Sequence, residues 1–403
     1  MLQYFAFIFV LMLFIPDAYI YWLYIREREN SPLSTLHSPL SILHSPLFKI
    51  LWWLPSAILA AGFMWARYIG TQNPMSERQS IIAWLGIFIL CIGVPKVIFM
   101  LVDLIGRLLH AIIKPISMRW FVWLGIILAV GFFCIAFYGS TLGLSHFQVK
   151  QVSYTSPRLP EGFDGYRIVQ ISDIHSGSYK DRPSIVKKMV ELVNEQQGDV
   201  IFFTGDLVNQ RSNEVDQFVD VLSQMHAPDG VYSILGNHDY GTYFRWKQPV
   251  DEEINQEHLE NQQFNMGWKF LKNQHDIISH NGDSIAVIGV ENDGNPPFPH
   301  LADLPKASAG TEGMFRILLS HDPTHWRREV LPTTDIDLML AGHTHAAQFM
   351  LFGWSPASWI YDEWGGMYQE GAQSLYVNIG IGFVGLPFRF GAWPEITVIT
   401  LHR

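Results

Sequence analysis

Four long apolar runs in the first 144 residues constrain the fold of this chain more strongly than any other feature. Each run is close to the roughly 20 residues that a helix needs to cross a lipid bilayer. The first run has no basic segment before it and no convincing small-residue cleavage site, so we expect a retained helix rather than a signal peptide. Four membrane-spanning helices are therefore predicted, over residues 2–25, 48–69, 81–102 and 120–138.

Polar residues are concentrated in the rest of the chain. Of the 403 residues, 49% are hydrophobic and only 16% are charged, which is too apolar for one soluble domain. Most of the charge and nearly all histidines follow residue 144, so we expect a transmembrane anchor over residues 1–145 and a polar domain over residues 146–403. The net charge of −10 argues against a nucleic-acid partner, which would require a basic surface.

The lysines and arginines around the four runs predict the orientation in the membrane. The first and third loops carry six of these residues, whereas the opposite side carries three. We therefore expect these two loops in the cytoplasm, and both the amino terminus and the polar domain outside it. The six are Arg26, Arg28, Lys49, Arg107, Lys114 and Arg119, and the three are Arg67, Arg78 and Lys150.

Two features of the membrane part leave alternatives open. Lys96 follows Pro95 inside the third run, where a charge is costly. It is either a lysine that snorkels near a kink or, together with Asp17, part of a transport pathway. Residues 104–116 place apolar side chains on one face, which predicts a separate helix lying in the membrane interface.

The polar domain alternates strand and helix patterns. Apolar strands are predicted over residues 166–172, 200–204 and 230–235, with helical periodicity over 182–197 and 215–225 between them. Further strands follow at 285–290, 315–320 and 336–341. Such alternation is typical of an α/β domain with parallel strands.

Side chains of metal-ligand type follow five of these strands. In open α/β sheets, the loops at the carboxyl ends of the strands converge on one crevice. Each motif alone is also compatible with an ordinary turn, because Asn and Asp are common there. Taken together they predict a metal site formed from Asp173 and His175, Asp206, the sequence Asn237-His238-Asp239, His321, and His343 with His345.

These five motifs, in this order, resemble the calcineurin-like metallophosphoesterase family. The resemblance covers residues 166–403, and segments 375–382 and 387–396 are similar to its membrane-associated phosphodiesterase branch. Ala346 and Ala347 depart from that branch, which usually has two glycines there. The resemblance implies an α/β domain of the αββα sandwich type, preceded by an all-α transmembrane region of four helices.

The resemblance also implies a centre with two divalent metal ions. Mixed carboxylate, amide and imidazole ligands suit Mn, Fe or Zn better than an all-oxygen Mg or Ca site. One ion would be held by Asp173, His175, Asp206 and His345, and the other by Asp206, Asn237, His321 and His343.

Three further residues receive roles in this scheme. His238 is left without a metal and is the candidate general acid, with Asp239 as its candidate orienting partner. Arg389 either contacts the substrate phosphate or forms a structural salt bridge. The other histidines of the polar domain are expected to be surface or core residues without chemistry: His226, His258, His275, His280, His300 and His325.

The predicted function is hydrolysis of a phosphodiester or pyrophosphate by a membrane-anchored enzyme. Aromatic residues at 349–364 either pack in the core or form an apolar lip beside the site. Because the site is tethered to a membrane, a phospholipid or lipid-linked phosphate is the preferred substrate. The alternatives are a general phosphomonoesterase and a non-catalytic metal-binding sensor or scaffold, and the oligomeric state stays open.

Overall fold

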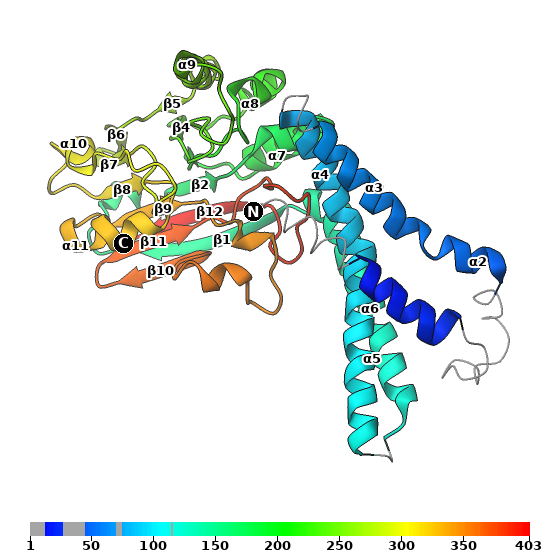
Figure 1. Cartoon of the computed structure of the whole chain (residues 1–403). Coiled ribbons are helices and arrows are strands. Elements are labelled where there is room, and N and C mark those ends of the chain that lie inside the picture. The colour runs from blue at the N-terminus through cyan, green and yellow to red at the C-terminus, as the bar shows by residue number, and fades with distance from the viewer. Residues whose placement is uncertain (1–12, 27–44, 70–74, 114–115) are drawn as a thin grey trace. The chain divides into compact units, whose positions relative to one another are not determined.

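The computed structural model describes residues 13–26, 45–69, 75–113 and 116–403 (Figure 1). The chain divides into two compact units. The first comprises Met1–Thr141 with Gly385–Phe388, and the second comprises Leu142–Val384 with Arg389–Arg403.

Up to Thr141, the described part of the first unit is almost entirely helical. Three helices there are long and apolar enough to cross a membrane, namely Pro46–Trp65, Ile81–Ile112 and Met118–Ser145. A shorter apolar helix, Leu13–Ile25, covers the second half of the first predicted span, whose first half lies outside the described residues. The individual elements are η1 (Tyr21–Ile25), α2 (Pro46–Leu51), α3 (Leu54–Ile69), α4 (Met75–Phe88), η3 (Ile89–Gly93), α5 (Val94–Ile112) and α6 (Met118–Thr141).

The prediction of a separate interfacial helix over residues 104–116 is wrong. Helix α5 continues without a break to Ile112, because Gly106 is the weakest helix former after residue 102 and one glycine costs only about 1 kcal/mol. Gly106 packs against α6, where an added Cβ would lie 2.8 Å from Cδ2 of Phe121. Arg107, counted above as a loop residue, therefore lies within this helix.

Lys96 is paired rather than snorkelling. Its Nζ lies 2.6 Å from Oδ1 of Asp17, which is fully buried. The same aspartate accepts a hydrogen bond from Ser56, and its backbone carbonyl accepts one from Nε1 of Trp52 at 3.1 Å. Pairing of this kind offsets the cost of placing both charges in an apolar helical unit.

The second unit contains two six-stranded sheets among its described residues. The first has the order β1 (Gln148–Thr155), β12 (Glu395–His402), β2 (Arg167–Ile171), β3 (Val200–Phe203), β4 (Val231–Ser233) and β5 (Lys269–Phe270). The second has the order β10 (Gly366–Glu370), β11 (Gln373–Val377), β9 (Leu338–Ala341), β8 (Arg316–Leu319), β7 (Asp283–Gly289) and β6 (Gln274–His280).

Parallel pairing at the centre of each sheet brings the strand ends together. Strands β2, β3, β4 and β5 are parallel, with Ile168 opposite Val200. Strands β7, β8, β9 and β11 are parallel in the other sheet, with Ile317 opposite Leu338. The carboxyl ends of neighbouring strands therefore lie at the same edge of each sheet.

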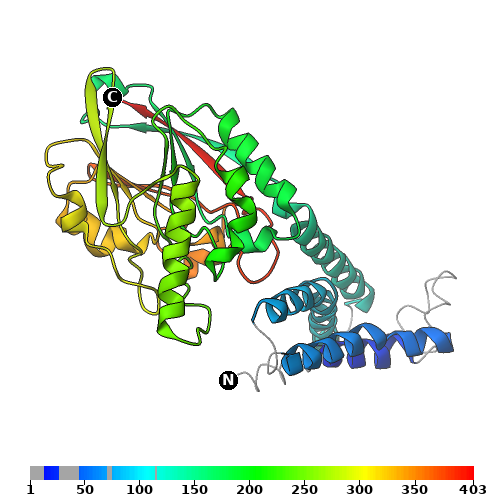
Figure 2. The same ribbon diagram turned by 90° about the horizontal axis from the view of Figure 1, so that it is seen from above.

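Three apolar layers show how the sheets and helices stack (Figures 1 and 2). Helices α7 (Pro183–Glu195) and α9 (Pro249–Asn265) pack on the outer face of the first sheet. Phe202 and Tyr232 of that sheet meet Ile317 and Leu340 of the second sheet between them. Helix α10 (Leu304–Ser308) and the π-helical turn η9 (Trp326–Val330) cover the outer face of the second sheet. The order helix, sheet, sheet, helix confirms the expected αββα fold.

One segment after β3 departs from its predicted structure. The helix predicted over 215–225 is instead a 3₁₀ turn, η8 (Asp216–Phe218), followed by a four-residue helix, α8 (Val219–Leu222). The remaining elements are α11 (Leu331–Thr333) and the 3₁₀ turns η4 (Gly143–Ser145), η5 (Glu161–Phe163), η6 (Ser176–Tyr179), η7 (Ser212–Glu214), η10 (His345–Gln348) and η11 (Pro356–Trp359).

Candidate metal centre

The predicted ligands follow strands of both sheets, and five of them have a left-handed backbone. Non-glycine residues in this region cost on the order of 1–3 kcal/mol each, and the surrounding structure must hold them there. The chain turns sharply at each strand end, which brings consecutive ligand side chains to one place. The φ angles are 53° for Asp173, 47° for His175, 61° for Asp206, 75° for His343 and 51° for His345.

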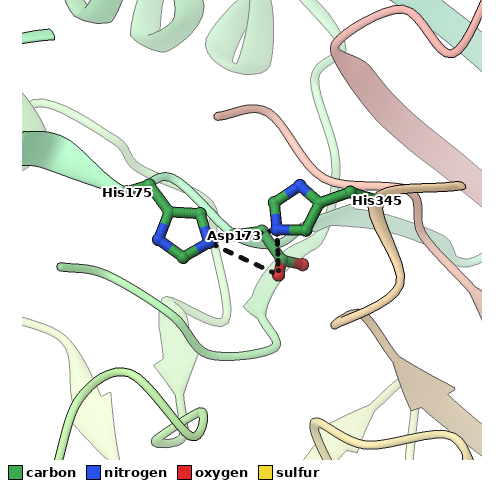
Figure 3. A group of neighbouring side chains, drawn as sticks. All are labelled: Asp173, His175 and His345. Atoms are coloured by element: carbon green, nitrogen blue, oxygen red, sulfur yellow. Dashed lines mark hydrogen bonds and ion pairs between the residues drawn. The ribbon is translucent and has the colours of Figure 1, made fainter. Parts of the chain in front are cut away.

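The first group comprises Asp173, His175 and His345, all buried (Figure 3). Nε2 of His345 lies 3.2 Å from Oδ1 of Asp173, and Nε2 of His175 lies 3.9 Å from the same oxygen. The two Nε2 atoms are 3.1 Å apart. Three donor atoms at these separations can bind one ion.

Asp206 joins this group to a second one. Its Oδ2 lies 3.6 Å from Nε2 of His175 and 3.2 Å from Nε2 of His321. His343 and Asn237 complete the second group, with Nδ1 of His343 2.7 Å from Oδ1 of Asn237. The structure thus brings together all seven residues that were predicted as metal ligands.

The ionisation of these groups suits metal binding. Burial alone would raise the pKa of Asp173 and Asp206, but neighbouring histidines hold both below the ordinary value. Burial lowers the pKa of His175 and His343, so both are neutral at physiological pH. Burial would lower the pKa of His321 too, but Asp206 raises it to about 10. His321 must therefore release a proton when it binds a metal.

The orientation of His321 supports its role as a ligand. Its Nδ1 lies 2.7 Å from the carbonyl oxygen of Thr204, so this nitrogen carries a hydrogen and Nε2 is the free donor. Nε2 is buried without a hydrogen-bond partner among the described residues, although Oδ2 of Asp206 is 3.2 Å away. The two atoms are close but not aligned as donor and acceptor, as expected when both face a common ion.

His238 lines the same site but has a different partner from the one predicted. Nδ1 of His238 lies 2.6 Å from the carbonyl oxygen of Asn209, so Nδ1 donates and Nε2 is left to exchange a proton. The backbone N–H of His238 donates to Oδ1 of Asp206 at 2.8 Å, which fixes this residue beside the shared carboxylate.

The expected orienting role of Asp239 is wrong. Its buried carboxylate accepts hydrogen bonds from the backbone N–H groups of Asp206, Leu207, Val208 and Gly236, at 2.8–3.1 Å. It therefore shapes the loop that carries Asp206. Burial and the charge of Asp206 raise the pKa of Asp239 to about 7.

The expectation that Arg389 contacts the substrate is also wrong, because this side chain is completely buried. Its guanidinium donates to the carbonyl oxygens of Gly382, Ala392 and Ile379, and Nη2 lies 2.9 Å from Nδ1 of His345. An arginine only donates, so Nδ1 of His345 accepts here. Metal binding through Nε2 therefore requires this ring to turn or the arginine to withdraw.

Two tyrosines belong to the site. Tyr361 lies in the aromatic stretch 349–364, for which a place beside the site was one of two expectations, whereas Tyr243 was not predicted. The hydroxyl of Tyr361 lies 3.0 Å from Nε2 of His343. The hydroxyl of Tyr243 accepts a hydrogen bond from Nδ2 of Asn237 at 2.8 Å, and its ring stacks on His238 at 4.2 Å. Tyr243 lies in an aromatic loop, residues 240–246, that contains no metal-ligand motif, so the sequence did not mark it as part of the site. A cavity of about 220 Å³ opens at the site, lined by Asp206, Asn237, His238, Phe298, His343, Thr344, His345, Tyr361 and Val384.

Comparison with known proteins identifies the family. The family model described as "Calcineurin-like phosphoesterase" matches residues 166–347, which contain all seven clustered ligands. The chain belongs to the calcineurin-like phosphoesterase family. A second model, "Probable Calcineurin-like phosphoesterase, transmembrane domain", matches residues 2–144. The chain is therefore a metal-dependent phosphoesterase with a transmembrane domain.

Other calcineurin-like phosphoesterases resemble much of this chain. The metallophosphoesterase YkuE of Bacillus subtilis is 32% identical over 280 residues, which are 66% of this chain and 89% of that protein. The "Transmembrane protein with metallophosphoesterase domain" of Danio rerio is 32% identical over 279 residues, 67% of this chain and 60% of that protein. A solved dimetal phosphatase from Danio rerio covers 54% of this chain and 88% of its own, with 11% identity and a TM-score of 0.33, a likeness too weak to support any argument.

Proposed function

We propose that this protein hydrolyses a phosphodiester or pyrophosphate at a centre of two divalent metal ions, with Mn, Fe or Zn as candidates. Asp173, His175, Asp206 and His345 hold one ion, and Asp206, Asn237, His321 and His343 hold the other. The observation that carries the proposal is the position of the Asp206 carboxylate, within 3.6 Å of His175 and 3.2 Å of His321. Two ions bound this way supply an activated water and stabilise charge on the phosphoryl oxygens.

His238 acts as the general acid in this proposal. The carbonyl of Asn209 accepts its Nδ1–H, so the proton that leaves with the product comes from Nε2. Tyr243 stacks on the imidazole ring and limits its rotation. Asn237 and His238 lie at one strand tip, so the metal-binding and proton-donating groups are positioned together.

The preferred substrate is a phospholipid or another lipid-linked phosphate. The loop over residues 349–360 exposes large apolar side chains, with Phe352 98% and Trp359 77% accessible. It is tied to the metal centre, because Ser355 donates to the carbonyl of Ala346 and Tyr361 contacts His343. The cavity of about 220 Å³ is below the usual size of a site for a whole drug-sized ligand, so it suits a phosphate with its attached groups outside.

The exposed loop is also connected to the start of the catalytic unit. Phe349 pairs with Phe390, whose ring packs on Trp393. Trp393 in turn stacks on His146 at 4.6 Å, five residues after helix α6 ends at Thr141. Phe349, at the start of the apolar loop, is thus linked by side-chain contacts to the first residues of the catalytic domain.

The same proposal includes the membrane topology. We keep the division into a four-helix anchor over residues 1–145 and a catalytic domain over 146–403, in a multi-pass protein of the cell membrane. The excess of lysine and arginine in the first and third loops supports an extracytoplasmic catalytic domain. Labelling of introduced cysteines from either side of sealed vesicles would measure the orientation.

The first test is hydrolysis of a bis-aryl phosphodiester by the purified full-length protein with Mn. Asp206→Asn should abolish turnover, because it removes the carboxylate shared by both groups. His238→Ala should lower kcat by about 10²–10⁴-fold on an alkyl diester, and by less on an aryl diester whose leaving group needs little protonation. His226→Ala, at an exposed histidine outside the site, is the control. Unchanged activity in either site variant would contradict the proposal.

A second test separates lipid from soluble substrates. The double variant Phe352→Ser, Trp359→Ser should lose at least about tenfold in turnover of phosphatidylglycerol in mixed micelles, because burying a large side chain in lipid contributes roughly 1.5–3 kcal/mol. Its turnover of the soluble diester should not change. Phe264→Ser is the matched control, since Phe264 is 78% exposed on helix α9. Efficient cleavage of soluble diesters by the wild type without any cleavage of lipid phosphates would refute the lipid assignment.

A further inference from the structure

A second cluster of metal-ligand side chains lies outside the centre described above. It comprises Asp293, His325 and Glu329, whose donor atoms all lie within 4.8 Å of one another. Nε2 of His325 is 3.1 Å from Oδ2 of Asp293 and 2.9 Å from Oε2 of Glu329. His325 precedes the π-helical turn η9, Glu329 lies within it, and Asp293 comes from the loop after β7. Two segments far apart in the sequence thus meet at one imidazole nitrogen.

The environment of His325 makes Nε2 an available donor. This side chain is completely buried, and its Nδ1 lies 2.9 Å from Oγ of Ser320. Nε2 forms a hydrogen bond with Oε2 of Glu329 at 2.9 Å. When the hydroxyl of Ser320 accepts the Nδ1 hydrogen instead, the lone pair of Nε2 is free for an ion between the two carboxylates. A hydrogen bond to the far nitrogen is the usual way in which a protein orients a histidine ligand.

Asp293 is poorly satisfied without an ion. Its side chain is fully buried, and Oδ2 has no hydrogen-bond partner among the described residues, even though Nε2 of His325 is 3.1 Å away. The other oxygen, Oδ1, is paired with Arg328 at 2.8 Å and with His300. A buried carboxylate oxygen without a partner is costly, and this one faces the other two donors.

From this arrangement we propose that Asp293, His325 and Glu329 bind a further divalent cation, separate from the catalytic centre, for which Zn²⁺ is the best match. Zinc accepts imidazole and carboxylate ligands at about 2.0–2.2 Å in tetrahedral geometry. Ligand atoms of such a site are separated by roughly 3.3 Å, close to the 2.9 and 3.1 Å separations here. Three protein ligands leave one position for water. The sequence-based expectation that His325 has no chemistry is replaced by this proposal.

The site would stabilise the segment that carries a catalytic ligand. His321 lies in sequence between Ser320 and His325, whose side chains contact each other. Within the same segment, the side chain of Asp322 accepts a hydrogen bond from the backbone N–H of Thr324 at 2.9 Å. An ion at His325 would fix the end of this segment to the loop at Asp293. The role of this ion is therefore to stabilise the segment after β8 that carries His321. The proposal does not depend on the identity of the substrate.

The test is the number of Zn²⁺ ions bound per chain by the full-length protein in detergent, measured by mass spectrometry of the metal after removal of excess Zn²⁺. The wild type should bind three ions. His325→Gln and Glu329→Gln should each bind two, or bind the third at least tenfold more weakly. Glu329 is partly exposed, so Glu329→Gln still tests the third ion if the substitution at buried His325 prevents folding.

His226→Gln serves as the control, because His226 is an exposed histidine whose Nδ1 contacts only the carbonyl oxygen of Gln224 in its own turn among the described residues. It should bind three ions. A wild type that binds no more ions than Glu329→Gln would overturn the proposal, since His325 would then be a protonated partner of two carboxylates. Three ions in Glu329→Gln with unchanged affinity would overturn it as well, because the third ion would lie elsewhere.

Discussion

Replacing Gly236 by alanine tests the proposed centre with the smallest possible change. Gly236 lies directly before Asn237, and its backbone passes against the loop that carries Asp206. An added Cβ would lie 2.6 Å from the backbone nitrogen of Asp206 and 2.7 Å from its Cγ, whereas ordinary contacts begin at 3.4 Å. The φ of Gly236 is not in the left-handed region, so alanine introduces no backbone strain of its own. The effect is purely steric.

The magnitude follows from these distances. Restoring ordinary contact moves Asp206 and Gly236 apart by about 0.8 Å. A misplacement near 1 Å costs about 100-fold in catalysis, or roughly 2.7 kcal/mol of transition-state stabilisation. Because Asp206 belongs to both ligand groups, we expect kcat/KM to fall about 100-fold and the metal content to fall with it.

The assay is hydrolysis of a bis-aryl phosphodiester over a range of Mn concentrations, with metal content measured on the same preparations. Gly131→Ala is the matched control, because the added methyl would have no described atom within 4 Å and no unusual φ. It should leave both quantities unchanged. The reasoning is refuted if Gly236→Ala, folded as shown by circular dichroism, keeps kcat/KM within about threefold of the wild type at normal metal content.

Three further predictions concern the same centre. Arg389→Met should lower the free energy of unfolding by about 1–3 kcal/mol and leave KM for the diester unchanged, because the buried guanidinium donates to three backbone carbonyls and not to substrate; a raised KM at unchanged stability would restore the substrate-binding role. Chelation should abolish hydrolysis and Mn should restore it, and activity that survives exhaustive chelation would contradict a metal centre. In the metal-free protein, burial lowers the pKa of His175 in the folded state below its ordinary value of 6.5. As the pH falls through 6.5, the unfolded state therefore binds the proton first, and the free energy of unfolding decreases. His175→Asn should flatten this decline in thermal midpoint, and an unchanged slope would contradict it.

The strand ends and their ligands could be predicted from the sequence because both signals are local. Apolar runs such as Val200–Phe203 are typical of buried parallel strands, and Asp206 follows directly. The convergence of five such tips then needs only the general rule that parallel strands end at one edge. The α/β class and the clustering of the ligand side chains were accessible for this reason, whereas the αββα type and the two ligand groups were implied by the family resemblance.

The roles of Asp239 and Arg389 could not be predicted because their partners are backbone groups. A carboxylate beside the proposed general acid His238 in sequence suggests an orienting pair, yet Asp239 faces four N–H groups, three of them about thirty residues away in the sequence. Arg389 likewise serves carbonyl groups whose positions depend on the folded tail. Tertiary structure decides which backbone N–H or C=O groups a side chain contacts, and the residue type does not predict them.

The ligand loops come from both sheets, and this couples the active centre to the interior of the sandwich. Asp206 follows β3 of one sheet, whereas His321 follows β8 of the other. An ion held by both acts as a cross-link between the sheets, so its binding energy also opposes their separation. By the same linkage, substitutions in the layer between the sheets, such as at Phe202 or Leu340, should lower metal affinity without touching a ligand. Metal occupancy would then report how well the two halves of the domain are packed.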